Sequence, residues 1–304
     1  MSAVPLLQRW RSLARSELQR QYDNRGAIPE HPAIFRRWSE ESAAFRRSHP
    51  HSCLDLRYGP DPRQRIDLFL PASSSQLNPP LLVYLHGGYW QSLSKSDFSF
   101  VASGASKRGF AVAVVGYRLC PQVSLVEIVE DVRSASLYLW RQGLALGFDR
   151  SRMIVSGHSA GAHLAAMLLT TQWHRFGKRT ASELVGGALG ISGLYQLDAL
   201  VDTPVNDALG LDCALARSLS PVVLEPAYAS VMLTAVGAAE SDEYHRQSDC
   251  LATLWPPLGV AVDHLELAGH NHFSIVDELA EVDGSLCGLL PSLLEATAER
   301  KPGD

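Results

Sequence analysis

Hydrophobic and polar residues follow two periods along the chain. Short runs that are apolar at almost every position are typical of buried strands, and apolar residues at every third or fourth position are typical of helices. The expected strands are 81–85, 110–115, 153–156, 188–192, 231–236 and 260–267, and the expected helices among them are 98–108, 125–146 and 162–170. Strands that alternate with helices pair in parallel through crossovers. The pattern therefore predicts an α/β fold with a mostly parallel, twisted sheet that helices cover on both faces.

The beginning of the chain has a different pattern. Leu6, Trp10 and Leu13 are spaced as on one face of a helix. Residues 1–50 are therefore expected to form N-terminal helices that pack over another part of the protein.

Two further segments depart from strand-helix alternation. Residues 52–58 and 65–70 alternate on either side of a Gly-Pro-Asp-Pro turn, which predicts two antiparallel strands. The least regular segment lies at about 200–228 and is a candidate for a small cap insertion. Because α/β folds often reach this length as one unit, we expect a single domain over 1–304.

Composition and charge narrow the class of protein. The 304 residues are 46% hydrophobic and 19% charged, which is typical of a globular chain. A formal net charge of −5, without a run of basic and aromatic residues, gives no attraction for nucleic acid. No apolar stretch approaches the roughly 18 residues of a membrane-spanning helix, and the N-terminal leucines are interrupted by arginines, unlike a secretory signal. We expect neither nucleic acid nor a membrane as a partner.

The cysteines indicate a reducing compartment. Their number is odd and no Cys-x-x-Cys pair occurs among Cys53, Cys120, Cys213, Cys250 and Cys287. An odd number cannot be paired completely within one chain, so a cytoplasmic protein is expected. The oligomeric state is open, with a homodimer as one alternative.

A Gly-His-Ser-Ala-Gly sequence at 157–161 lies where an expected strand meets an expected helix. In that context a Gly-x-Ser-x-Gly sequence is typical of a sharp turn that raises the serine hydroxyl above the sheet as a nucleophile. The backbone N–H groups at the start of the helix then face developing negative charge. Ser159 is the predicted nucleophile, and a tight turn without chemistry is the less favoured alternative.

A second glycine-rich turn, His-Gly-Gly-Tyr-Trp at 86–90, directly follows an expected strand. Its glycines allow a substrate to approach the backbone closely. The N–H groups of Gly88, Tyr89 and Ala160 are the predicted oxyanion hole, and Gly87 and Trp90 are predicted to contact substrate. A structural turn with two core aromatics is the alternative, but a position before the nucleophile in the chain order of an α/β hydrolase favours the functional interpretation.

A serine nucleophile requires a base, and the base requires an acid that orients it. In such folds the acid follows a later strand and the base lies near the end of the chain. The loop after 231–236 offers Glu240, Asp242 and Glu243, and the loop after 260–267 offers His270 and His272. Chain order restricts the choice to these two loops.

The same two histidines, His270 and His272, could also be metal ligands. No third ligand, such as an HExxH helix would supply, accompanies them in the sequence. The chain also has no Gly-x-x-x-x-Gly-Lys loop and no Gly-x-Gly-x-x-Gly sequence that opens a βαβ unit. We therefore expect no metal and no cofactor.

Together these motifs resemble the kynurenine formamidase (arylformamidase) branch of the α/β-hydrolase superfamily. The resemblance rests on HGGYW, GHSAG, the GAAESDEYHRQS segment, GHNHFSIV and the N-terminal YDNRGAIPEHP, and it extends from roughly residue 20 to residue 280. It implies a serine hydrolase with an α/β-hydrolase fold that cleaves N-formyl aryl amides or small carboxylic esters.

The resemblance also implies roles for individual residues. The family's base matches His272, which directly precedes Phe273, and its acid falls four residues before the YHRQS segment, at Glu240. Many members have Asp at that position, so Asp242 remains a second candidate acid. The N-terminal helices and the irregular segment of about 200–228 are expected to cover the active site.

Three functions follow from this reading. The first is an arylformamidase that acts on a small-molecule amide, and the second is a carboxylesterase for small esters. The third is a receptor that uses the hydrolase fold without catalysis. Because candidates for nucleophile, base and acid are all present, the receptor is the least favoured of the three. A receptor without an activated serine would not react with a fluorophosphonate probe, whereas either enzyme would.

Overall fold

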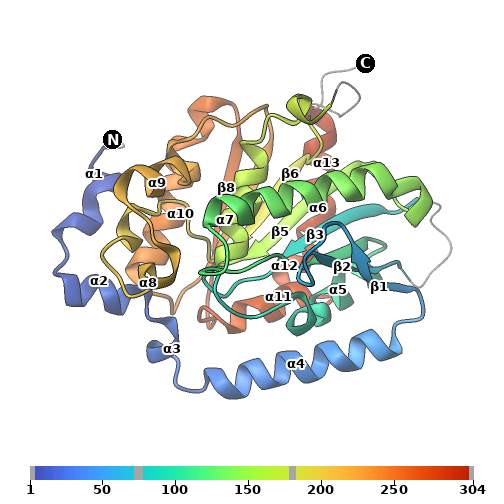
Figure 1. Ribbon diagram of the computed structural model, residues 1–304, viewed down its shortest axis with the longest axis horizontal. Helices are drawn as coiled ribbons and strands as arrows, with labels where there is room; N and C mark the ends of the chain where they lie inside the picture. The colour runs from blue at the N-terminus through green and yellow to red at the C-terminus, as the bar shows by residue number, and fades with distance from the viewer. Residues whose placement is uncertain (1–3, 72–77, 178–182, 301–304) are drawn as a thin grey trace.

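A mixed eight-stranded sheet forms the centre of the computed structural model (Figure 1). The structure describes residues 4–71, 78–177 and 183–300, so the outermost residues of the expected 1–304 domain and 1–50 segment lie outside it. The strands are β1 (Ser52–Arg57), β2 (Arg65–Phe69), β3 (Pro80–Leu85), β4 (Ala111–Val115), β5 (Asp149–His158), β6 (Gly187–Ile191), β7 (Val231–Gly237) and β8 (Ala261–Leu267).

The strand order is β1-β2-β4-β3-β5-β6-β7-β8, and pairing is parallel from β4 through β8. The strand β2 pairs antiparallel with β1 and with β4. The predicted α/β fold with a mostly parallel sheet is confirmed, and so is the antiparallel pair at its edge. The carboxyl ends of β3, β5, β6, β7 and β8 therefore meet at one edge of the sheet.

Helices cover the sheet on both faces. The helices are α1 (Val4–Gln8), α2 (Arg15–Tyr22), α3 (Asn24–Ala27), α4 (His31–Ser48), α5 (Ala102–Lys107), α6 (Leu125–Leu146), α7 (Ala160–Leu169), α8 (Asn206–Leu209), α9 (Cys213–Ser218), α10 (Asp242–Leu254), α11 (Asp277–Ala280), α12 (Ser285–Gly288) and α13 (Leu290–Arg300). In Figure 1, α6 and α7 lie in front of the sheet and α4 runs along its lower side. Among the helices of the described ranges, none is both long and apolar enough to cross a lipid bilayer.

Alternate residues of each strand enter two different cores. In β3, Leu81, Val83 and Leu85 pack with α6 and α7, whereas Leu82 and Tyr84 pack with α5 and α13. All five side chains are buried. A strand that is apolar on both faces can be stable only between two helical layers, which explains the continuous apolar run in its sequence.

The segment expected as a helix over 98–108 is less regular than its pattern predicts. Two 3₁₀ turns, Lys95–Asp97 and Ser99–Val101, precede α5, which begins at Ala102. Phe98, Phe100 and Val101 are all buried in one core, and the tighter turns place these nearly consecutive residues against it.

The N-terminal helices contact segments that follow β3 and β7. In α4, Trp38 is buried and the Ser42 hydroxyl accepts a hydrogen bond from the backbone N–H of Phe100. Tyr22, at the end of α2, donates its hydroxyl proton to Glu243 of α10 at 2.7 Å. Buried polar contacts therefore fix this segment to the rest of the protein.

Candidate active site

Ser159 lies at the turn between β5 and α7. Its backbone has φ 57° and ψ −117°, a conformation that residues other than glycine rarely adopt. The Ser159 N–H donates to the carbonyl of Ile191 in β6 at 2.8 Å, which ties the strained turn to the sheet. Strain of this kind persists only where the surroundings enforce it, and it is frequent at functional sites.

The two glycines of the turn are required by space. A Cβ atom on Gly157 would clash with the backbone of Gly161, and a Cβ atom on Gly161 would clash with the carbonyl of Leu85 at the end of β3. Only glycine allows the start of α7 to approach β3 this closely. The strand-turn-helix geometry that the GHSAG sequence predicts is thus present.

The structure pairs His272 with Glu240. The His272 Nδ1 lies 2.7 Å from Glu240 Oε2, and both side chains are almost completely buried. Glu240 Oε1 accepts two more hydrogen bonds, from the Ser192 hydroxyl at 2.6 Å and from the Gly237 N–H at 2.7 Å. The carboxylate is therefore fixed by groups at the ends of β6 and β7, and it orients the imidazole.

The alternative residues of the two loops lie elsewhere. Asp242 is exposed at the first position of α10. Glu243 is buried but forms an ion pair with Arg246. His270 faces Glu278, with 3.3 Å between its Nε2 and the carboxylate. Across the described ranges, no three His, Cys, Asp or Glu side chains are grouped so that they could hold a metal ion.

His158 positions the segment that carries His272. Its Nε2 lies 2.7 Å from the backbone carbonyl of His272, which can only accept, so Nε2 carries the proton. Burial is the main cause that lowers the pKa of His158 well below its ordinary value, and the nearby His272 lowers it further. His158 is therefore a neutral donor at physiological pH.

The His-Gly-Gly-Tyr-Trp turn lies beside the nucleophile. A Cβ atom on Gly87 would come within 3.3 Å of the Ser159 Cβ, and Gly88 has φ 110°, which favours glycine. In the part of the chain that the structure describes, the N–H groups of Gly88, Tyr89 and Ala160 donate to no other protein group. These three donors are available to a ligand.

Trp90 is not placed where the sequence predicts it. Its side chain is completely buried, and its ring packs edge-on against His163 of α7 with 5.0 Å between the centroids. The backbone φ is positive at Tyr89 and Trp90, and the Trp90 side chain belongs to the hydrophobic core. The expected contact between Trp90 and substrate is thus replaced by a packing role.

A small enclosed cavity of about 30 Å³ adjoins Ser159 and His272. Its lining residues are Asn24, Arg25, Phe35, Trp38, Gly88, Tyr89, Leu93, His158, Ser159, His272 and Phe273. The aromatic wall is compact, since the Phe35 ring lies 5.3 Å from Trp38 and 5.0 Å from Phe273 between centroids. Four of the lining residues come from the N-terminal segment, so this segment forms part of the cavity wall.

A larger open cleft of about 730 Å³ lies next to this cavity and shares four lining residues with it: Asn24, Arg25, Gly88 and Tyr89. Its outer wall includes Thr203, Pro204 and Val205 of the irregular segment that was expected as a cap. The Gln91 side chain donates to the carbonyl of Val205 at 2.7 Å and so links this wall to the glycine-rich turn.

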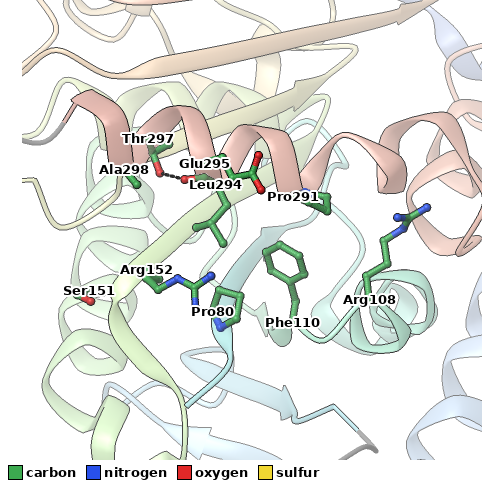
Figure 2. A pocket seen from close by; sticks show the side chains of 10 residues that line it. All are labelled: Pro80, Arg108, Phe110, Ser151, Arg152, Pro291, Leu294, Glu295, Thr297 and Ala298. Atoms are coloured by element: carbon green, nitrogen blue, oxygen red, sulfur yellow. Dashed lines mark hydrogen bonds between the residues drawn. The ribbon is translucent and has the colours of Figure 1, made fainter. Parts of the chain in front are cut away.

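Figure 2 shows a separate hollow of about 290 Å³ between α13 and the sheet. It contains Pro80, the first residue of β3, and Glu295 of α13. Because it lies at the amino end of β3, it is at the opposite edge of the sheet from Ser159. None of the predicted site residues lines it.

Comparison with known proteins identifies the family. Over 299 residues the chain is 31% identical to kynurenine formamidase of Danio rerio, an alignment that covers 94% of this chain and 98% of that protein. The chain belongs to the kynurenine formamidase family. Residues 66–193 also match the BD-FAE family.

Solved structures show the same fold. A protein of Silicibacter sp. TM1040, provisionally described as a thioesterase, is 30% identical with a TM-score of 0.79, over 90% of this chain and 99% of that one. An esterase of Pyrobaculum calidifontis is 18% identical with a TM-score of 0.65, over 93% and 97%. This member of the kynurenine formamidase family is therefore a hydrolase with the α/β-hydrolase fold.

Sequence reasoning missed three residues that the structure brings to the site. Asn24 and Trp38 line the small cavity, and Tyr244 packs against His272 with 4.4 Å between ring centroids. Tyr244 belongs to the YHRQS segment, on which the family resemblance partly rests, but no chemical role was predicted for this tyrosine. The signal in the sequence that could have identified it is its position, four residues after Glu240 in a segment that the family shares.

Proposed function

We propose that this kynurenine formamidase homologue cleaves N-formyl aryl amides through Ser159, His272 and Glu240. The observation that carries the proposal is the 30 Å³ aromatic cavity that directly adjoins Ser159 and His272. On the same scale one water molecule requires about 10–15 Å³, so the cavity suits a formyl group and is tight for larger acyl groups. The open cleft beside it has the size of a typical ligand site and would receive the aryl leaving group.

The proposed reaction proceeds in two halves. Ser159 Oγ attacks the formyl carbon while His272 Nε2 takes the hydroxyl proton, and Glu240 stabilises the imidazolium that forms. The C–N bond then breaks, and His272 returns the proton to the leaving nitrogen. Water, activated by His272, attacks the formyl enzyme and releases formate and free Ser159.

The oxyanion of each half-reaction would be held by the N–H groups of Gly88, Tyr89 and Ala160. Their freedom from other protein acceptors supports this role. Donors that are fixed before the reaction stabilise the developing charge without reorganisation, and the loss of one such donor typically costs about 10²–10³ in rate.

Formanilide and acetanilide test the acyl preference. The acetyl group adds one methyl to the group that must enter the small cavity, so kcat/KM for formanilide should exceed that for acetanilide by about 10- to 100-fold. Phe35→Ala, which opens the aromatic wall, should reduce this ratio, whereas Phe176→Ala, outside the cavity, should preserve it. Equal values for the two substrates in the wild type would contradict the proposal.

A carboxylesterase for small esters is the second candidate. It is favoured by the likeness to the Silicibacter protein, provisionally described as a thioesterase, at 30% identity. The same serine, histidine and oxyanion donors would serve an ester. A fluorophosphonate probe should label Ser159 under either activity, and absence of labelling would favour the receptor interpretation.

The cellular setting belongs to the proposal as well. All five cysteines are unpaired, which supports a reducing compartment such as the cytoplasm. The proposed substrate is a small molecule, and the mechanism uses only groups of this chain. A homodimer remains a prediction for sedimentation measurements.

A further inference from the structure

Three side chains from distant parts of the sequence form a buried hydrogen-bond chain beside Ser159. Asn24 Nδ2 donates to the Tyr244 hydroxyl at 2.7 Å. The hydroxyl groups of Tyr244 and Tyr89 lie 2.7 Å apart, and Tyr89 also donates to the carbonyl of Tyr22 at 2.7 Å. Tyr244 lies beside the site, since its ring is 4.4 Å from that of His272 between centroids, and Asn24 and Tyr89 line the small cavity together with Ser159.

The direction of each hydrogen bond follows from counting protons. A tyrosine hydroxyl has one proton, and Tyr89 gives its proton to the Tyr22 carbonyl, which can only accept. The short contact between the two hydroxyls therefore requires Tyr244 as the donor. Burial raises the pKa of both tyrosines, so both protons are present at neutral pH.

This count leaves Tyr244 with one unused acceptor position. Its proton is directed to Tyr89, and one lone pair is occupied by the Asn24 amide. Among the hydrogen bonds of the described residues, the remaining lone pair has no donor. A substrate N–H that is buried beside Ser159 needs an acceptor, because an unsatisfied polar group at a buried site is costly, and this lone pair can supply one.

We propose that Tyr244 accepts the N–H of the scissile amide and thereby makes the site selective for amides over esters. In the tetrahedral intermediate the leaving nitrogen is two bonds from Ser159 Oγ and so comes close to the groups that surround that oxygen. An amide nitrogen carries a proton there, whereas the corresponding ester oxygen carries none. Asn24 and Tyr89 act as positioning residues, since they direct the Tyr244 proton away from the substrate.

The proton balance of the cleavage step agrees with this role. The nitrogen keeps its original proton, bound to Tyr244, and receives a second proton from His272 as the C–N bond breaks. It leaves as a neutral arylamine. This inference rests on the proposed function, because it concerns how the same site treats the leaving group.

The test compares formanilide, phenyl formate and N-methylformanilide, with the hydrolysis of phenyl formate in buffer subtracted. Tyr244→Phe should lower kcat/KM for formanilide by about 10- to 100-fold. It should change kcat/KM for phenyl formate and for N-methylformanilide, which both lack the N–H, by less than about 3-fold. A merely structural role of Tyr244 would reduce all three rates together.

Two further variants sharpen the test. Tyr89→Phe removes the acceptor of the Tyr244 proton, so that proton can turn toward the site, and the ratio of kcat/KM for formanilide to that for phenyl formate should fall. Tyr228→Phe is the matched control, because it removes a hydroxyl that donates to the carbonyl of Val185 just before β6, at the far edge of the sheet. This variant should keep the ratio of formanilide to phenyl formate.

The outcomes separate the two proposals. If the wild type cleaves phenyl formate but not formanilide, the formamidase function fails and the inference falls with it. If the wild type cleaves formanilide and Tyr244→Phe lowers all three substrates equally, or none of them, only the role of Tyr244 is overturned. Thermal unfolding of each variant checks that the fold is retained.

Discussion

At the scale of single residues, Ser159 combines a strained backbone with a small side chain. The turn that strains it is fixed by Gly157 and Gly161, which remain when the serine is replaced. Removing the hydroxyl therefore leaves the fold intact and leaves no large cavity.

Ser159→Ala should lower kcat for formanilide by a factor on the order of 10³ or more, as in other hydrolases that lose a member of the triad. Circular dichroism and the midpoint of urea unfolding should match the wild type. Wild-type turnover in a correctly folded Ser159→Ala protein would contradict the nucleophile assignment.

Glu240 and Asp242 give a matched pair of carboxylates in one loop. Glu240 contacts His272, whereas Asp242 is exposed. Glu240→Gln keeps the shape but removes the charge that stabilises the imidazolium, so kcat should fall by orders of magnitude. Asp242→Asn should leave kcat nearly unchanged. Steady-state kinetics of the two variants decide the acid, and the reverse result would move it to Asp242.

At the scale of elements, the helix α10 joins the N-terminal segment to the sheet through buried charge. Arg246 forms a two-pronged ion pair with Glu243 inside the helix, and Arg246 also donates to Gln196 at 2.6 Å. The Arg246 and Glu243 side chains are almost fully buried, with exposed fractions of 1% and 3%. Removing one partner would leave a buried charge without compensation.

Glu243→Ala should lower the free energy of unfolding by about 3 kcal/mol or more. The control is Glu130→Ala in α6, which breaks an ion pair of the same i,i+3 spacing with Arg133, but with half of the glutamate side chain exposed. That variant should cost less than about 1 kcal/mol. Urea unfolding curves measure both, and equal losses would show that burial does not strengthen this pair.

Elements also show what can be predicted from sequence. The Gly-x-Ser-x-Gly turn was predictable because strand, turn and helix are adjacent in the chain and each leaves a local pattern. The wall formed by Phe35 and Trp38 was not, since helical spacing shows only that α4 has an apolar face. Which surface that face covers depends on contacts with Phe273 and Phe98, far away in the sequence. Tyr244 was missed for the same reason.

At the scale of the whole molecule, three histidines are buried as neutral groups. Burial lowers the pKa of His86 to about 3 and that of His163 to about 4, and it lowers the pKa of His158 as well. In the unfolded chain each has a pKa of about 6.5. Between these values the unfolded chain binds more protons, so stability is complete above about pH 6.5 and falls as the pH decreases.

The free energy of unfolding should therefore decrease between pH 7.5 and pH 5 by about 2 kcal/mol for each of His86 and His163, and His158 should add to the decrease. Urea unfolding at several pH values measures the decrease. His163→Gln keeps a donor for the carbonyl of Leu219 without a titrating group, so its pH dependence should be smaller by about 2 kcal/mol. An unchanged slope in this variant would contradict the prediction.

The walls of the small cavity beside Ser159 come from separate parts of the chain. The loops of the sheet supply Ser159 and His272, whereas α4, which lies outside the sheet, supplies Phe35 and Trp38. Under the proposed function, reaction chemistry and substrate choice are thus encoded in different stretches of the sequence. Evolution, or an engineer who exchanges α4 between homologues, can change the acyl group that is accepted while the inherited catalytic apparatus stays untouched.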